Sequence, residues 1–181
     1  MTIDQFWQII DQCSPHSFDM GLKCRSLEKA ISTLTPDELR AFTDHYWSCR
    51  TKAYHWPLWD AASISHGGCG DDSFMDYRSS LITFGRDTFE SALSDPDSLG
   101  DLEHPIPRSQ DVYVVIHSVA ERMLGPNYRP PGGDPSEPTG ESIEGAEDYD
   151  SIALNRFPKL HAQRDRISAT IQQKKPWWKL W

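Results

Sequence analysis

Apolar residues recur every three or four positions over most of the first 125 residues, and this spacing places them on one face of an α-helix. Two capping-box patterns, Thr2 with Gln5 and Thr35 with Glu38, mark positions where helices begin. The pattern predicts a mainly α fold, a single compact domain of about six or seven helices. At Val112–Ile116 the β-branched residues leave a strand as the alternative.

Short polar stretches separate the predicted helices. Gly67 and Gly68 follow an apolar run and are expected to end a helix. Asp71 or Asp72 is expected to cap the next one. The stretch from 94 to 108 is rich in proline, aspartate and glycine, which predicts a loop.

The chain has 181 residues, enough for one well-packed domain with an appendage. We assign the domain to residues 1–125. Residues 126–150 contain five prolines, four glycines and seven acids against one arginine, which predicts an acidic disordered linker or long surface loop. Residues 151–181 form a basic C-terminal segment, since seven basic residues and one acid occur from Arg156 onward.

The chain closes with a basic peptide that contains three of its seven tryptophans. Exposing so much aromatic surface is unfavourable, and Pro176 disfavours a helix interior. Three alternatives stay open: the peptide binds in the groove of a protein partner, it binds an anionic membrane surface, or it folds back onto its own domain. The residues expected to make the contacts are Lys174, Lys175, Trp177, Trp178, Lys179 and Trp181.

Composition narrows the class of protein. The formal net charge of −9 disfavours nucleic acid as a partner, because phosphates repel an acidic molecule. The four cysteines are scattered without a CxxC pair, which favours free thiols in a reducing cytoplasm. The N-terminus lacks a signal-peptide pattern, so a cytoplasmic location is expected. Familiar nucleotide, hydrolase and metalloprotease motifs do not occur, and neither a cofactor nor a metal is expected.

A longer motif lies between Tyr54 and Leu93. Its members are Gly67-Gly68-Cys69, Asp71-Asp72, Phe74, Arg78, Leu81-Ile82, Gly85-Arg86, Phe89-Glu90 and Ala92-Leu93. Together with FWQII, TPDELRAF and the pieces at 95–99 and 156–160, it resembles an uncharacterised bacterial domain family, common in actinobacteria, that is catalogued as a domain of unknown function. The resemblance implies a helical fold and no particular activity. Gly70, Ser73 and Ser80 depart from the family pattern, so chemistry that needs a hydroxyl at position 70 is not expected.

His66, Cys69, Asp71 and Asp72 form the most suggestive group for catalysis. A histidine beside a thiol can generate a thiolate nucleophile, and a carboxylate can orient the imidazole. The structural alternative is favoured: a junction between two helices, where the glycines end one helix, Cys69 fills a small apolar pocket and the aspartates cap the next helix.

Other side chains near this junction are candidates for ligand binding. Arg78 and Arg86 can clamp an anionic ligand, although ion pairs with neighbouring acids are the favoured interpretation. Trp56 and Trp59 can wall a pocket, but such rings usually pack in a core. Zinc usually needs four ligands in closely spaced pairs, which disfavours a metal site here.

These features predict a non-enzymatic cytoplasmic protein-interaction module whose C-terminal peptide tethers it to an unknown partner. One alternative is an enzyme or small-ligand binder with a pocket around His66, Cys69, Asp71, Asp72 and Arg78. The other is a peripheral membrane protein attached through KKPWWKLW.

Overall fold

The computed structural model describes residues 1–13, 16–130 and 135–173, with side chains up to Thr170. Every regular element in these ranges is helical, which confirms the predicted mainly α class. The described ranges contain nine α-helices and one 3-10 helix, so the expected six or seven was too low. The elements are α1 (Ile3–Asp11), α2 (Met20–Ile31), α3 (Pro36–Lys52), α4 (Trp56–His66), α5 (Asp71–Ile82), α6 (Arg86–Ser94), η1 (Pro96–Asp101), α7 (Asp111–Leu124), α8 (Tyr149–Arg156) and α9 (Pro158–Gln173).

Helices α1 and α3 begin where the capping patterns predict. The side chains of Thr2 and Thr35 each accept a hydrogen bond from a first-turn N–H, and Gln5 and Glu38 accept one from the backbone of the cap. Both capping boxes are therefore complete.

The junction between α4 and α5 is only partly as expected. Gly67 ends α4 in the left-handed conformation, at a φ of 69°. The prediction that Asp71 or Asp72 caps α5 is wrong, because Gly70 occupies the cap position without a side-chain hydrogen bond. The two acids lie in the first turn, where they meet the positive end of the helix dipole.

The favoured helix at Val112–Ile116 is confirmed, whereas the loop expected between 94 and 108 is not loop throughout. Val112–Ile116 belongs to α7 and not to a strand, because Val112, Ile116 and Val119 share one buried helical face. The predicted loop between 94 and 108 contains η1, which begins at Pro96 and is capped by the Asp95 side chain.

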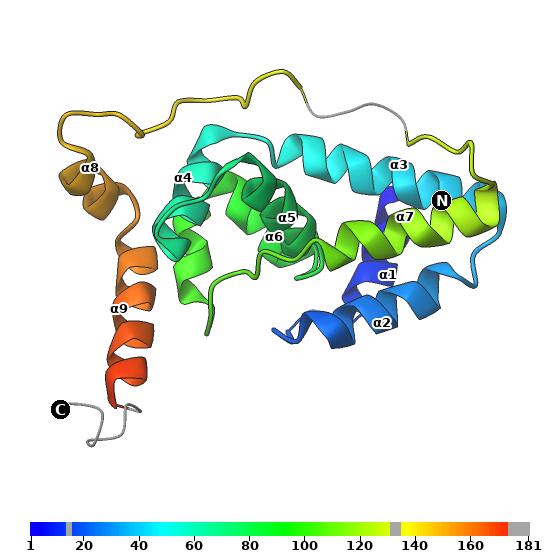
Figure 1. The fold of residues 1–181 in the computed structure, drawn as a ribbon, viewed down its shortest axis with the longest axis horizontal. Coiled ribbons are helices and arrows are strands. Elements are labelled where there is room, and N and C mark those ends of the chain that lie inside the picture. Colours follow the sequence, from blue (N-terminus) through cyan, green and yellow to red (C-terminus); the bar gives the residue numbers. More distant parts are fainter. Residues whose placement is uncertain (14–15, 131–134, 174–181) are drawn as a thin grey trace.

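One hydrophobic core joins the helices of the first two thirds of the chain. Helix α7 packs against α2 and α3, and α5 packs against α3, α4, α6 and α7 (Figure 1). Phe6, Phe42, Phe74 and Val112 are fully buried in this core. Removal of such side chains from water is the main stabilising contribution to a fold of this kind.

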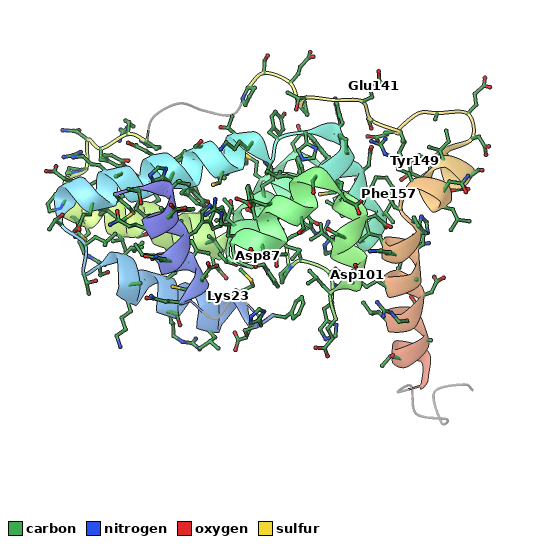
Figure 2. The ribbon with its side chains drawn as sticks, turned by 180° about the vertical axis from the view of Figure 1, so that it is seen from behind. Lys23, Asp87, Asp101, Glu141, Tyr149 and Phe157 are labelled. Atoms are coloured by element: carbon green, nitrogen blue, oxygen red, sulfur yellow. The ribbon has the colours of Figure 1, made fainter. Side chains whose placement is uncertain are left out.

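A lysine is buried at the edge of the same core. The Nζ of Lys23 donates to the carbonyl oxygen of Thr83 at 2.8 Å and lies 4.0 Å from the centre of the Phe84 ring. Burial lowers the pKa of Lys23 to about 8, since desolvation penalises the ammonium form. Lys23 belongs to α2 and lies away from Phe157 and Tyr149 (Figure 2).

The described residues 135–173, called here the C-terminal arm, pack against α4 and η1. Helix α7 ends at one end of the molecule and α8 begins at the other (Figure 1). Thr139 exchanges backbone hydrogen bonds with Tyr54 and Trp56 at 3.1 and 2.8 Å. Ile143 is buried at 6% exposure. Part of the stretch that composition marks as a linker or long surface loop is thus bonded to the start of α4.

In the described ranges, no helix combines the length and the apolar character needed to cross a bilayer.

Stability is expected to fall below about pH 6.5 because of the cap of α4. The Nδ1 of His55 accepts from the N–H of Leu58 at 3.4 Å, and its Nε2 is buried without a hydrogen-bond partner among the described residues. Burial lowers the pKa of His55 from its ordinary 6.5. A depressed folded-state pKa contributes stability above the unfolded-state value, and this contribution is lost as pH falls through the folded-state value.

The variant His55→Asn keeps an oxygen acceptor at the cap and removes the titration. Urea unfolding of both proteins at about pH 7.5 and about pH 5.5 measures the effect. We expect the wild-type chain to lose more unfolding free energy between the two values than the variant does. Equal losses would show that His55 does not titrate on unfolding.

Candidate functional site

His66 is held by the loop before α7. Its Nε2 lies 3.0 Å from the carbonyl oxygen of Ile106, which requires the proton on Nε2, and its ring meets the edge of Tyr77. Burial lowers the pKa of His66, so the neutral ring is favoured. The imidazole therefore has a structural bond of its own at the end of α4.

Cys69 lies half-buried just after α4. Its carbonyl oxygen accepts from the Trp59 indole at 2.5 Å, and the neighbouring Gly68 carbonyl accepts from Arg108 at 3.0 Å. Burial raises the pKa of the Cys69 thiol, and the Arg108 guanidinium opposes part of that increase. The protonated thiol is thus favoured at neutral pH.

The four residues suggested for catalysis do not come together in one site. His66 is bonded to Ile106, whereas Cys69 faces the Arg108 side of the junction. Asp71 and Asp72 are exposed on the first turn of α5. Within the described residues, no three or more His, Cys, Asp or Glu side chains are placed to hold a metal ion.

Arg78 is fully buried and lies among aromatic rings. Its guanidinium carbon is 4.5 Å from the centre of the Tyr54 ring and 5.2 Å from that of Phe74. Its Nη1 donates to the carbonyl oxygen of Arg50 at 2.9 Å. Arg78 thereby ties α5 to the end of α3.

Arg86 lies on another face of the molecule. Its guanidinium pairs with Asp4 and with Glu90, each at 2.7 Å, and its backbone N–H donates to Asp11. These contacts join α6 to α1. The ion-pair interpretation of Arg86 is therefore the one that agrees with the geometry.

The tryptophans form a stack with α5. Trp56 stacks on Trp59 with ring centres 5.1 Å apart, and Trp59 stacks on Phe74 at 4.5 Å. This stack includes Phe74, one of the rings beside Arg78. Stacked rings stabilise a fold by more than the burial of their apolar area.

A cleft of about 520 Å³ opens beside this stack, between α4 and the C-terminal arm. Of the catalytic and ligand-binding residues suggested by the sequence, Cys69 alone lines it. Half of the wall belongs to α4 and the α4–α5 junction, and half to the arm. The lining residues are Asp60, Ser63, Ile64, Gly67, Gly68, Cys69, Glu144, Gly145, Tyr149, Asp150, His161 and Arg164.

Asp60 is the buried acid of the cleft, at 4% exposure. Its carboxylate accepts from the Ser142 hydroxyl at 2.8 Å and from the backbone N–H of Ile143 at 3.1 Å. Burial raises the pKa of Asp60, and these two hydrogen bonds oppose the increase. Asp60 thus joins α4 to the arm at one edge of the cleft.

His161 and Arg164 form the opposite wall on α9. Nη2 of Arg164 lies 3.3 Å from Nδ1 of His161. Arginine only donates, so Nδ1 accepts and the ring proton is on Nε2. That Nε2 is buried and has no hydrogen-bond partner among the described residues.

The charges in the cleft are predominantly acidic. Asp60, Glu144 and Asp150 supply carboxylates, whereas Arg164 supplies the single arginine or lysine of the wall. Such a site repels polyanions and can bind neutral or positively charged polar groups.

Sequence reasoning missed Asp60, Tyr149, His161 and Arg164. Asp60 carried a usable signal, since it is a charged residue between the apolar positions 58–59 and 61–62 of α4. The residues of the arm carried none, because only the packing of the arm brings them to α4.

A comparison with protein families finds one match. The sequence model of the family described as "Protein of unknown function (DUF4240)" matches residues 1–122. Neither the curated proteins nor the solved structures contain a match to this chain. The matched range includes α4, the α4–α5 junction and η1, and it ends before the arm.

Cys69 is expected to be the one thiol that reacts in the folded protein, and to react slowly. Cys13, Cys24 and Cys49 are buried, and the pKa of Cys69 is raised. Titration with a chromogenic disulfide reagent near neutral pH should therefore modify one thiol per chain, and four after denaturation. Cys69→Ser should abolish the native reaction. A rate above that of an ordinary exposed thiol would contradict the protonated state.

Proposed function

We propose that this chain, which belongs to the DUF4240 family of proteins of unknown function, binds a small polar molecule in the cleft between α4 and the C-terminal arm. The observation that carries the proposal is the cleft itself. Its volume of about 520 Å³ falls in the range of ligand sites, about 300 to 1,000 Å³.

The chemistry of the wall defines the class of ligand. Ser63 and Ile64 line the cleft from α4, and Glu144, Tyr149 and Asp150 line it from the arm, so the wall is mostly polar and acidic. Neither carboxylate has an ion-pair partner among the described residues. Amino, hydroxyl and amide groups match this set, whereas phosphorylated molecules do not.

Ligand binding is tested by thermal denaturation against a panel of amines, polyols and amino acids, with nucleotides as the opposing panel. A ligand at about 100 times its Kd stabilises the native state by about 2.7 kcal/mol, which raises the Tm by several degrees. Ser63→Trp fills the cleft, and the matched control Ser118→Trp adds the same ring to an exposed position on α7.

We expect ligands to raise the Tm of the wild-type chain and of Ser118→Trp but not of Ser63→Trp. The same ligands should protect Cys69 from a thiol reagent, because Cys69 lines the cleft. Stabilisation that persists in Ser63→Trp would place binding elsewhere. A preference for nucleotides would overturn the proposed ligand class.

Tethering through the C-terminal peptide is the second candidate function. The residues that would carry it, 174–181, lie outside the described residues. Its structural support is the C-terminal part of α9, which extends beyond the other helices and whose residues 168–170 are exposed (Figure 1). A helix that ends away from the core presents the following peptide to a partner.

Removal of residues 174–181 tests this candidate. We expect a chain that ends at Gln173 to keep the Tm of the full chain and to lose capture of a partner from the host lysate. In a matched variant, Trp177, Trp178 and Trp181 are changed to Ala. This variant keeps the lysines, so it separates the contribution of the aromatic rings from that of the charge. Binding to phosphatidylserine vesicles that weakens with salt would instead support membrane association.

A cytoplasmic location also remains part of the proposal. Its support is that all four cysteines are free, three of them buried in the helical core.

A further inference from the structure

We infer that docking of the C-terminal arm on η1 forms and controls the cleft, and that Asp97 is the residue that holds the arm in place. The inference rests on the proposed ligand function and adds how that site is regulated. Asp97 does not line the cleft, so its effect is transmitted through the position of α9.

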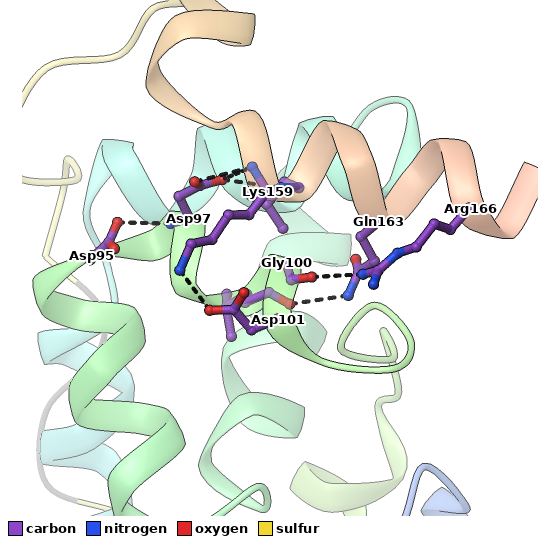
Figure 3. A network of polar contacts seen from close by, with 9 residues as sticks. Asp95, Asp97, Gly100, Asp101, Lys159, Gln163 and Arg166 are labelled. Carbon is purple, nitrogen blue, oxygen red and sulfur yellow. Dashed lines mark hydrogen bonds and ion pairs between the residues drawn. The ribbon is translucent and has the colours of Figure 1, made fainter.

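Asp97 caps a helix that is distant in the sequence. Asp97 is buried at 6% exposure, and its Oδ1 accepts from the N–H groups of Lys159 and Leu160, both at 3.0 Å (Figure 3). Its Oδ2 lies 3.2 Å from the same Lys159 N–H. Helix α9 begins at Pro158, so these are first-turn N–H groups that have no partner inside the helix.

A close backbone approach fixes the distance between η1 and α9. A Cβ atom added to Gly100 would lie 2.3 Å from the carbonyl carbon of Lys159 and 2.5 Å from the nitrogen of Leu160. Only glycine permits this approach. The two elements are therefore in direct backbone contact at this point.

Side chains of α9 extend the contact along the same face. Nε2 of Gln163 donates to the carbonyl oxygens of Leu99 and Leu102 at 3.1 and 2.8 Å. Arg166 donates to the carbonyl oxygen of Gly100 at 3.0 Å (Figure 3). Most of these bonds end on backbone atoms of η1, so they fix the rotation of α9 as well as its position.

The rotation of α9 decides whether the cleft exists. His161 and Arg164 flank Gln163 on the same turns of α9, and both line the cleft. Loss of the Asp97 cap would loosen this wall, whereas the bonds of Asp60 to Ser142 and Ile143 and of Thr139 to Tyr54 and Trp56 would still hold the start of the arm at α4. A ligand that touches both walls would in turn favour the docked arm, since coupling of this kind is reciprocal.

Accessibility of Cys69 to a bulky maleimide dye measures docking without any ligand. Asp97→Ala removes the cap, and Gly100→Ala pushes α9 away without a change of charge. Asp101→Asn is the matched control, because Asp101 contacts the same helix only through an exposed ion pair with Lys159. We expect labelling of Cys69 to accelerate about fivefold or more in Asp97→Ala, the usual effect of a lost cap, to accelerate also in Gly100→Ala, and to stay unchanged in Asp101→Asn.

The labelling of the three buried cysteines separates local from global effects. Acceleration at Cys69 alone, with Cys13, Cys24 and Cys49 still protected, supports the inference. Unchanged labelling of Cys69 in Asp97→Ala and Gly100→Ala would overturn it. Equal exposure of all four thiols in both variants would also overturn it, because the contact would then hold the whole fold. A cleft that opens in this way but binds no ligand would remove the proposed function and leave control by docking intact.

Discussion

The carboxylate of Asp97 is buried, and a buried carboxylate persists only where hydrogen-bond donors surround it. The donors here are the first backbone N–H groups of α9, which have no acceptor within their own helix. Two groups that are each unfavourable alone therefore satisfy one another. This contact sets where α9 begins and how it is turned, and the wall formed by His161 and Arg164 depends on it.

The core of this acidic chain is not entirely apolar, because it contains buried cations. Arg78 lies over Tyr54 and Phe74, and Lys23 lies over Phe84. Each also donates to a backbone carbonyl, so the charge is balanced by ring faces and by peptide oxygens. Tyr54 and Phe74 thus lie against a guanidinium, and Arg78 joins helices where the sequence also allowed an anion clamp.

Local signals predicted the helical framework well. Capping boxes and the spacing of apolar residues depend on neighbours within four positions, so they are visible in one sequence. The 3-10 helix η1 was missed because proline and aspartate are common in loops and in short helices alike. Its side chains gain their role only from α9, which follows about sixty residues later.

The candidate site was predictable only on one of its two sides. The sequence indicated the junction at Gly67, Gly68 and Cys69, which does line the cleft. It did not indicate the facing wall, because no pattern in a single sequence links α4 to α9. Two of the segments that carry the family resemblance, 95–99 and 156–160, contact each other in the structure through Asp97, Lys159 and Leu160. This contact is a physical reason why the two segments occur together.

The backbone contact at Gly100 bears on how the family is delimited. Asp97 and Gly100 lie inside the matched residues 1–122, while their partners lie some forty residues beyond the end of the match. A fragment cut at residue 122 would leave the Asp97 carboxylate without its two donors and would remove the backbone that requires glycine at position 100. Where a relative carries both the aspartate and the glycine of η1, a helix equivalent to α9 is to be sought further along its chain, even where the intervening sequence cannot be aligned.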